Sequence, residues 1–373
     1  MHAGMFPAVL ALAALLVSQA WPSGAGAPTG VLERLPDMAT ARAAHTATTL
    51  ADGRVLVVGG FEAASAGPAA EFFEPGRGRF TAAPAMRVPR HSHTATRLAD
   101  GRVLVAGGYG EGSRTLAAAE LFDPRTGLFT AIEPMKTARA NHVAVALADG
   151  RVLLVGGLGE GWTYLADAEL FDPATRTFTR VGPMTVAREG HAAARLADGR
   201  VIVVGGHQGP RRQLTLHDSA EIFDPATRTF SRTGRMTVRR HKHDAVLLPD
   251  GRVLVTGGSD ERDGDGAYAS AEFFTPATGA FTRGPEMRRA RYKHLGTSVL
   301  LADGRVLIAG GAVAAELFDP QAGAFFEVPG SGVRLPGLFS AAAALPDGRV
   351  LVSGGYGHGQ APAVSAWIHR PQR

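Results

Sequence analysis

Seven copies of one short segment divide this chain into similar units. The first copy, residues 50–60, has an Asp-Gly-Arg turn, a run of four apolar residues and then two glycines. The other copies keep this order and begin at Leu98, Leu147, Leu196, Leu248, Leu301 and Leu345. A nearly continuous apolar run of this length predicts a short strand that is buried on both faces.

The unit at residues 135–184 shows the rest of the pattern. Small or apolar residues alternate before Asp149-Gly150, and this dipeptide between two apolar runs predicts a hairpin with a type I′ turn. Two glycines end the second strand, and Asp172-Pro173 opens a later turn. The four predicted strands cover residues 142–147, 151–155, 168–171 and 178–181.

Four short antiparallel strands in a repeat of about 49 residues predict a β-propeller. The glycine pairs give seven blades and begin at Gly59, Gly107, Gly156, Gly205, Gly257, Gly310 and Gly354. The last unit has a third strand at residues 363–368 and no fourth, whereas residues 29–38 match the fourth-strand segment 126–135. We therefore expect an all-β, seven-bladed propeller over residues 28–373, with the N-terminal strand completing the last blade. Such closure removes exposed sheet edges.

These units resemble the kelch repeats. They share the glycine pair after the second strand and two aromatic residues, such as Phe171 and Phe178, at a fixed separation. Kelch repeats usually place Tyr and Trp at these aromatic positions, and this chain has Phe. The resemblance implies the propeller of the galactose oxidases. It leaves the function open, because kelch propellers include protein-binding scaffolds, sugar-isomerising enzymes and copper oxidases.

Six of the seven blades carry Arg-x-x-His before the inner strand and a glutamate in the third strand. A ring of these arginines and histidines could bind an anion or a metal ion. Alternatively, each arginine could neutralise the buried glutamate of its own blade. The last blade has Gly337, Ser340 and Trp367 at the three positions. Their joint loss favours the second interpretation, because it indicates that the residues depend on one another within a blade.

Residues that depart from the repeat are better candidates for a ligand site. The loops before the inner strands contribute His91, Asn141, Glu189, His241, Lys242, Tyr292 and Lys293. The loops after the glycine pairs contribute Trp162, Tyr164, His207, Tyr356 and His358. Kelch propellers place both sets of loops on one face, where aromatic, basic and histidine side chains would suit a sugar or a peptide. The alternative is that the aromatic residues only cap the blade edges.

Two further chemistries, calcium binding and copper-radical oxidation, find less support in the sequence. Asp260, Asp263 and Asp265 alternate as in a calcium loop, but no distal glutamate completes it, so a solvated acidic loop is favoured over calcium. The copper-radical oxidases need a cysteine cross-linked to tyrosine. This chain has no cysteine, and its nearest match to their Tyr-His pair is Tyr292-Lys293-His294.

The favoured function is therefore a binding module for a glycan, a cell-surface component or a protein, with no cofactor. The alternative is a carbohydrate-active enzyme similar to a sugar epimerase or mutarotase, with Glu189, Arg188 and His191 in the acid–base roles. The known kelch sugar epimerases have six blades rather than seven, which counts against this alternative.

Charge and the first residues refine this prediction. The net charge of +5 is spread through the repeats, so no nucleic-acid partner is expected. Residues 6–17 form an apolar run of signal-peptide length, too short to span a membrane comfortably. We expect a signal peptide within residues 1–27, cut after Ala20 or Ala27, and a secreted or periplasmic monomer. An uncleaved N-terminal anchor is the alternative.

Overall fold

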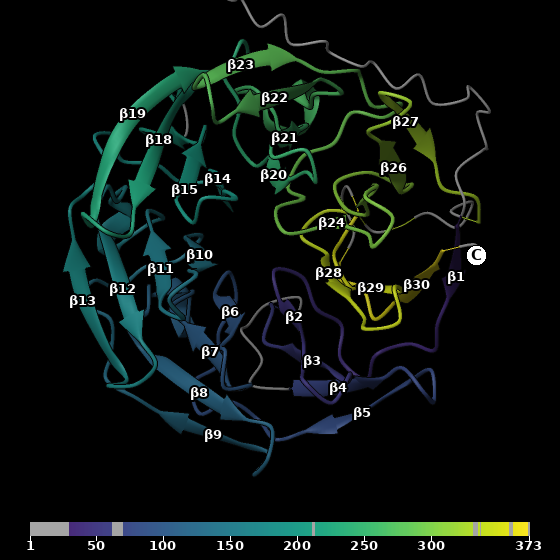
Figure 1. Cartoon of the computed structure of the whole chain (residues 1–373). Coiled ribbons are helices and arrows are strands. Elements are labelled where there is room, and N and C mark those ends of the chain that lie inside the picture. The colour runs from purple at the N-terminus through teal and green to yellow at the C-terminus, as the bar shows by residue number, and fades with distance from the viewer. Residues whose placement is uncertain are drawn as a thin grey trace, which may run out of the picture.

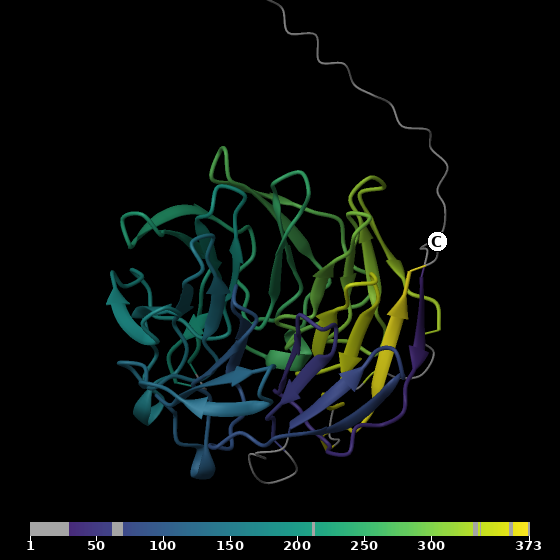
Figure 2. The same cartoon turned by 60° about the horizontal axis from the view of Figure 1, so that its bottom comes forward.

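Seven four-stranded antiparallel sheets form a closed ring in the computed structural model (Figure 1), which describes residues 30–61, 70–210, 213–330, 335, 337–357 and 361–371. The predicted all-β, seven-bladed propeller is confirmed. One strand of each sheet lies beside the central axis and its last strand lies at the rim. Seen obliquely, the sheets stand around the axis and the loops lie at the two ends of the ring (Figure 2).

The first four blades follow one another along the chain. Blade 1 contains β2 (Thr46–Thr49), β3 (Val55–Val58), β4 (Ala70–Glu74) and β5 (Arg79–Ala83). Blade 2 contains β6 (Thr94–Arg97), β7 (Val103–Ala106), β8 (Ala119–Asp123) and β9 (Leu128–Ala131). Blade 3 contains β10 (Val143–Ala146), β11 (Val152–Val155), β12 (Ala168–Asp172) and β13 (Thr177–Val181). Blade 4 contains β14 (Ala192–Arg195), β15 (Val201–Val204), β18 (Ser219–Asp224) and β19 (Thr229–Arg235).

The remaining blades complete the ring. Blade 5 contains β20 (Asp244–Leu247), β21 (Val253–Thr256), β22 (Ala271–Thr275) and β23 (Ala280–Arg283). Blade 6 contains β24 (Ser298–Leu300), β25 (Val306–Ile308), β26 (Glu316–Asp319) and β27 (Ala324–Glu327). Blade 7 contains β28 (Ala341–Ala344), β29 (Val350–Ser353), β30 (Ala366–Arg370) and β1 (Val31–Arg34).

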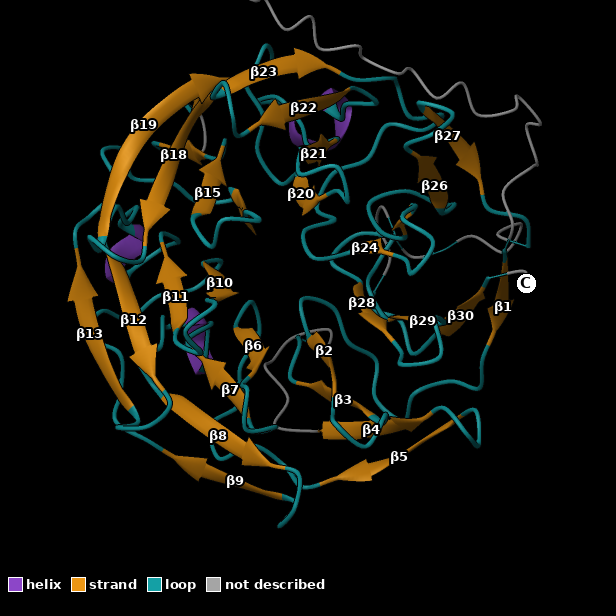
Figure 3. Ribbon diagram, viewed as in Figure 1, coloured by secondary structure: helices purple, strands orange, loops and turns teal. Residues whose placement is uncertain are grey.

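The loops after the glycine pairs carry the other short elements. A small hairpin pairs β16 (His207–Gln208) with β17 (Thr215–Leu216). The described residues contain three short 3-10 helices, which Figure 3 colours purple: η1 (Glu111–Ser113), η2 (Glu160–Trp162) and η3 (Asp263–Gly266). No helix among the described residues is long and apolar enough to cross a membrane.

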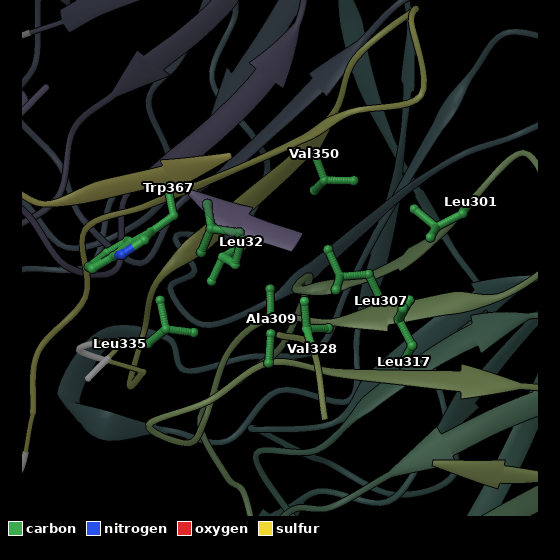
Figure 4. Packing of buried hydrophobic residues seen from close by; sticks show 11 residues of the cluster. Leu32, Leu301, Leu307, Ala309, Leu317, Val328, Leu335, Val350 and Trp367 are labelled. Carbon is green, nitrogen blue, oxygen red and sulfur yellow. The ribbon is translucent and has the colours of Figure 1, made fainter. Parts of the chain in front are cut away.

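The N-terminal strand closes the ring, as predicted. β1 pairs antiparallel with β30, with Val31 opposite Arg370 (Figure 1). Leu32 of β1 packs into a buried apolar cluster with Trp367 of blade 7 and with Leu307 and Val328 of blade 6 (Figure 4). The closing contact therefore buries apolar side chains as well as pairing backbone groups.

Two sequence predictions were wrong in detail. The strand expected at residues 363–368 begins at Ala366, because Ala363 instead bridges to Arg42 of blade 1. The hairpin turn is not type I′, since only the glycine has positive φ, as at Gly53 with +85°. In this hairpin the Asp52 carboxylate accepts hydrogen bonds from the backbone N–H of Arg54 at 3.0 Å and from its Nε at 2.8 Å. The result is a three-residue loop whose last residue, Gly53, is left-handed.

Candidate functional site

Six buried ion pairs explain the repeated arginine and glutamate. In each pair the guanidinium contacts a glutamate of the same blade at 2.5 to 3.0 Å: Arg42–Glu71, Arg90–Glu120, Arg139–Glu169, Arg188–Glu221, Arg240–Glu272 and Arg291–Glu316. The glutamates also accept backbone N–H groups from the segment before the arginine, as Glu120 does from Arg87 and Val88. These residues therefore hold six of the seven blades together, in agreement with the interpretation that their joint loss in blade 7 favoured.

The repeated histidines join neighbouring blades. His93 of blade 2 places Nε2 3.1 Å from the hydroxyl of Thr46 in blade 1, and a Cβ on Gly59 would lie only 2.6 Å from the His93 ring. The first glycine of the pair therefore lets the next blade approach closely. Burial lowers the pKa of His93 well below its usual value, with a further lowering from Arg90, so this ring is neutral.

Seven left-handed residues encircle one end of the central channel. Each is the residue before the histidine, or before Ser340 in blade 7, and has φ between +51° and +62°: Ala44, Ser92, Asn141, Gly190, Lys242, Lys293 and Phe339. Most are linked between blades, as when the Lys293 N–H donates to the Lys242 carbonyl at 2.8 Å. Three predicted site residues, Asn141, Lys242 and Lys293, therefore lie around one ring.

A continuous series of aromatic rings lies at the same end. Ring centroids are 6.1 Å apart for Tyr356–Phe61, 5.3 Å for Phe61–His91, 5.3 Å for His91–Tyr109 and 5.8 Å for Tyr109–Trp162. We call these five residues the aromatic belt, which extends from blade 7 to blade 3. Phe61, Tyr109 and Tyr356 each directly follow a glycine pair. Phe61 and Tyr109 were not among the predicted site residues, although their position directly after a glycine pair could have identified them.

Three buried ionisable groups meet beside the belt, and we call them the acid–histidine chain. Glu189 and His207 form an isolated bridge, which brings Glu189 Oε2 to 3.1 Å from His207 Nε2. His207 Nδ1 lies 2.9 Å from His241 Nδ1, and His241 Nε2 lies 3.2 Å from the Asp260 carbonyl oxygen. Burial raises the pKa of Glu189 to about 7 and lowers those of His207 and His241 to about 3 and 4. All three groups lie at positions where the residue varies between blades.

A lysine pair adjoins the acid–histidine chain. Lys242 Nζ donates to Asp263 at 2.7 Å, and Lys293 Nζ lies 3.4 Å from the same carboxylate and 3.2 Å from the Tyr356 hydroxyl. The Lys293 ammonium also lies 5.1 Å from the centre of the buried Tyr292 ring. The three blades that supply these groups place them at the mouth of the channel.

The acidic loop considered for calcium is occupied by the chain's own cations. Asp260 contacts Arg262, and Asp263 contacts Lys242. Among the described residues, no group of three ligand side chains is arranged to hold a metal ion, and Asp265 joins no such group.

Comparison with known proteins identifies the family. A family model described as the KLHDC2/KLHL20/DRC7 Kelch-repeats domain matches residues 92–311, more than half of the chain. The chain belongs to the kelch-repeat family. No curated protein matches it in sequence.

A solved structure shares the fold of this kelch propeller. It is described as a novel fungal alcohol oxidase with catalytic diversity among the AA5 family, in complex with copper. The TM-score is 0.71 at 17% identity, with 93% of this chain and 77% of that chain covered. At this identity the likeness shows the fold alone. In the kelch propeller described here, His294 is fully buried and places Nε2 3.2 Å from the Thr256 hydroxyl.

The other predicted site residues are placed as follows. Tyr164 packs against His207 at 5.6 Å and donates its hydroxyl to the Gly209 carbonyl. Arg188 is held by Glu221, and His191 packs beside Gly156 of blade 3. The side chains that hydrogen-bond to Glu189 are instead Asn141 and His207. His358 lies outside the described residues.

Proposed function

We propose that this kelch propeller is a binding module that recognises a protein segment or a glycan at the face carrying the aromatic belt. The observation that carries this proposal is Trp162, which is 66% exposed and has a left-handed φ of +63°. Exposure of the indole ring and a left-handed backbone are each energetically unfavourable for a tryptophan. Exposed tryptophan and tyrosine are common anchors of binding surfaces.

The turn itself does not require tryptophan. Blade 2 forms the same 3-10 turn with Glu111-Gly112-Ser113, where Ser113 has φ +58°. Blade 3 has Trp162 at the matching position of Glu160-Gly161-Trp162. Because serine supports the same backbone, the tryptophan contributes little to folding, which supports a role in binding.

Trp162→Ser is expected to weaken binding at least tenfold while leaving stability nearly unchanged. Loss of an aromatic anchor commonly weakens binding by about tenfold or more. The melting temperature should stay within about 2 °C of the wild type, since the serine turn already exists in blade 2. The measurement is binding of the full chain to arrays of purified glycans and synthetic peptides.

A matched control removes an exposed apolar residue elsewhere. Leu128 is 58% exposed on the outer strand β9, outside the aromatic belt. Leu128→Ser should bind the arrays as the wild type does. Equal loss of binding in both variants, or full binding by Trp162→Ser, would contradict the proposal.

A carbohydrate-active enzyme is the second candidate, and Glu189 favours it. A carboxyl group with a pKa of about 7 is suited to general acid–base catalysis near neutral pH. NMR exchange spectroscopy on glucose, galactose and N-acetylmannosamine would detect faster anomer exchange or epimerisation. The enzyme hypothesis requires that Glu189→Gln lowers that rate.

We also propose that the chain is exported, on the strength of its apolar N-terminal run. Residues 1–27 lie outside the described residues. Intact-mass measurement of the secreted protein should give a mature chain beginning at Trp21 or Pro28. A full-length chain retained with the cells would instead indicate an uncleaved anchor.

A further inference from the structure

Hydrogen-bond directions in the acid–histidine chain follow from its last member. A backbone carbonyl can only accept a hydrogen bond, so His241 must carry a proton on Nε2 to donate to Asp260. Burial and the Lys242 charge lower the pKa of His241 to about 4, so its ring is neutral. A neutral imidazole has one N–H only. His241 Nδ1 therefore presents a lone pair.

The lone pair of His241 fixes the proton positions on His207 and Glu189. His207 Nδ1 faces that lone pair at 2.9 Å, so His207 must donate from Nδ1. Burial lowers the pKa of His207 to about 3, so this ring is also neutral and its Nε2 is an acceptor. Opposite His207 Nε2, at 3.1 Å, stands Glu189 Oε2. The remaining proton must come from Glu189, which is therefore a neutral carboxylic acid.

The charged and titratable groups around the chain are consistent with this proton count. They are Tyr109 from blade 2, Tyr164 from blade 3, His217 from blade 4, Lys242 and Asp263 from blade 5, and Lys293 from blade 6. The Asp263 carboxylate lies within 3.4 Å of both lysine ammonium groups. It thereby offsets the positive charge that would favour an ionised Glu189.

Loss of the Glu189 proton would break the chain of donors. An ionised carboxylate only accepts, so His207 would have to move its proton to Nε2. Either two Nδ1 lone pairs would then face each other at 2.9 Å, or His241 would shift its proton to Nδ1 and turn an Nε2 lone pair toward the Asp260 carbonyl oxygen at 3.2 Å. The His207 ring, which packs edge-on against Tyr164 of the Trp162 loop, would have to move.

We propose that Glu189, His207 and His241 form a proton-dependent switch that controls the binding face. With the shared proton, the three groups are fully hydrogen-bonded and hold Tyr164 and its loop in place. Without the proton, the loop carrying Trp162 loses that support. The Tyr109 hydroxyl, buried without a hydrogen-bond partner among the described residues, lies close enough to sense the Glu189 charge. The control of binding rests on the proposed function, whereas the proton arrangement does not.

Histidine NMR on the full chain tests the proton arrangement. With ¹⁵N-labelled histidine at pH 6, His207 should carry its proton on Nδ1 and His241 on Nε2. Raising the pH to 8.5 should change the His207 signals with a midpoint near 7. In Glu189→Gln the amide N–H replaces the acid O–H, so the same tautomers should persist at both pH values. A His207 proton on Nε2 at pH 6, or the same pH response in Glu189→Gln, overturns the proposal.

Trp162 fluorescence tests the link to the binding face without any ligand. The difference between the wild type and Trp162→Ser isolates the Trp162 emission, which should shift between pH 6 and 8.5. Glu160→Gln is the matched control, because Glu160 is an exposed glutamate in the same turn. This variant should keep the shift and Glu189→Gln should lose it. A Trp162 emission that does not change with pH overturns the switch. The array binding of Trp162→Ser tests the proposed function separately.

Discussion

Arg90→Ala is expected to lower the free energy of unfolding by about 3–5 kcal/mol, because it leaves a buried carboxylate without its cation. Arg90 and Glu120 are both inaccessible to solvent and lie 2.9 Å apart. The same guanidinium also donates to the carbonyls of Gly107 and Ala118, each at 2.8 Å. Truncation therefore removes a donor from three buried acceptors, and among the described residues Glu120 keeps only its two neutral backbone donors, Arg87 and Val88.

Urea denaturation measures this loss. Arg289→Ala is the control, because its ion pair with Glu327 has the same length but is 42% exposed on both sides. Exposed pairs are worth about 0–1 kcal/mol. Arg90→Ala combined with Glu120→Gln should recover part of the stability, since the glutamine carries no charge. Equal losses at the buried and exposed pairs would refute the structural role of the repeated arginines.

Acidification is expected to unfold the propeller well above pH 3. Burial and a neighbouring arginine lower the pKa values of His45, His191 and His294 to about 3 from 6.5. The unfolded chain therefore binds more protons below pH 6.5, and stability falls as the pH falls from 6.5 toward 3. Each pKa unit corresponds to about 1.4 kcal/mol, so protonation of one such histidine lowers the free energy of unfolding by up to roughly 4–5 kcal/mol. The three together reach about 12–15 kcal/mol, which is comparable to the usual stability of a domain, about 5–15 kcal/mol.

Protonation of Glu189 changes the free energy of unfolding in the opposite direction, and the change is smaller than that from the histidines together. Its pKa is raised to about 7 in the folded chain, so its contribution is present below pH 4.5 and is lost as the pH rises to about 7. Because the histidines dominate, the melting temperature measured by calorimetry between pH 8 and pH 4 should fall steeply once the pH drops below 6.5. A melting temperature that stays constant between pH 7 and pH 5 would contradict the assignment of these histidines as neutral.

The frame of the molecule was predictable because it depends on repeated local signals. The Leu-x-Asp-Gly-Arg turn, the apolar strand and the glycine pair recur in every blade, and residues 29–38 matched a fourth strand. The turn type was not predictable from Asp-Gly alone, because the Asp52 side chain binds the following Arg54. The start of β30 also depended on a contact with another blade, at Arg42.

The candidate site was only partly predictable for a related reason. Departures from the repeat identified Asn141, Glu189 and Lys242, which the structure brings together. Sequence proximity suggested Arg188 and His191 as the partners of Glu189. The actual partner, His207, follows the next glycine pair and reaches Glu189 through a backbone bridge. Such pairing depends on how neighbouring strands of one blade are aligned. The repeats indicate that alignment only once the strands are placed.

The central claim is that the repeated residues hold the ring together, whereas residues that depart from the repeat form the binding face. The most direct test is the glycan and peptide array signal of equal amounts of folded wild type, Arg90→Ala and Trp162→Ser, read at a temperature where all three are folded. Arg90→Ala should keep the wild-type signal and Trp162→Ser should lose it. Loss of the signal in folded Arg90→Ala with retention in Trp162→Ser would contradict the account.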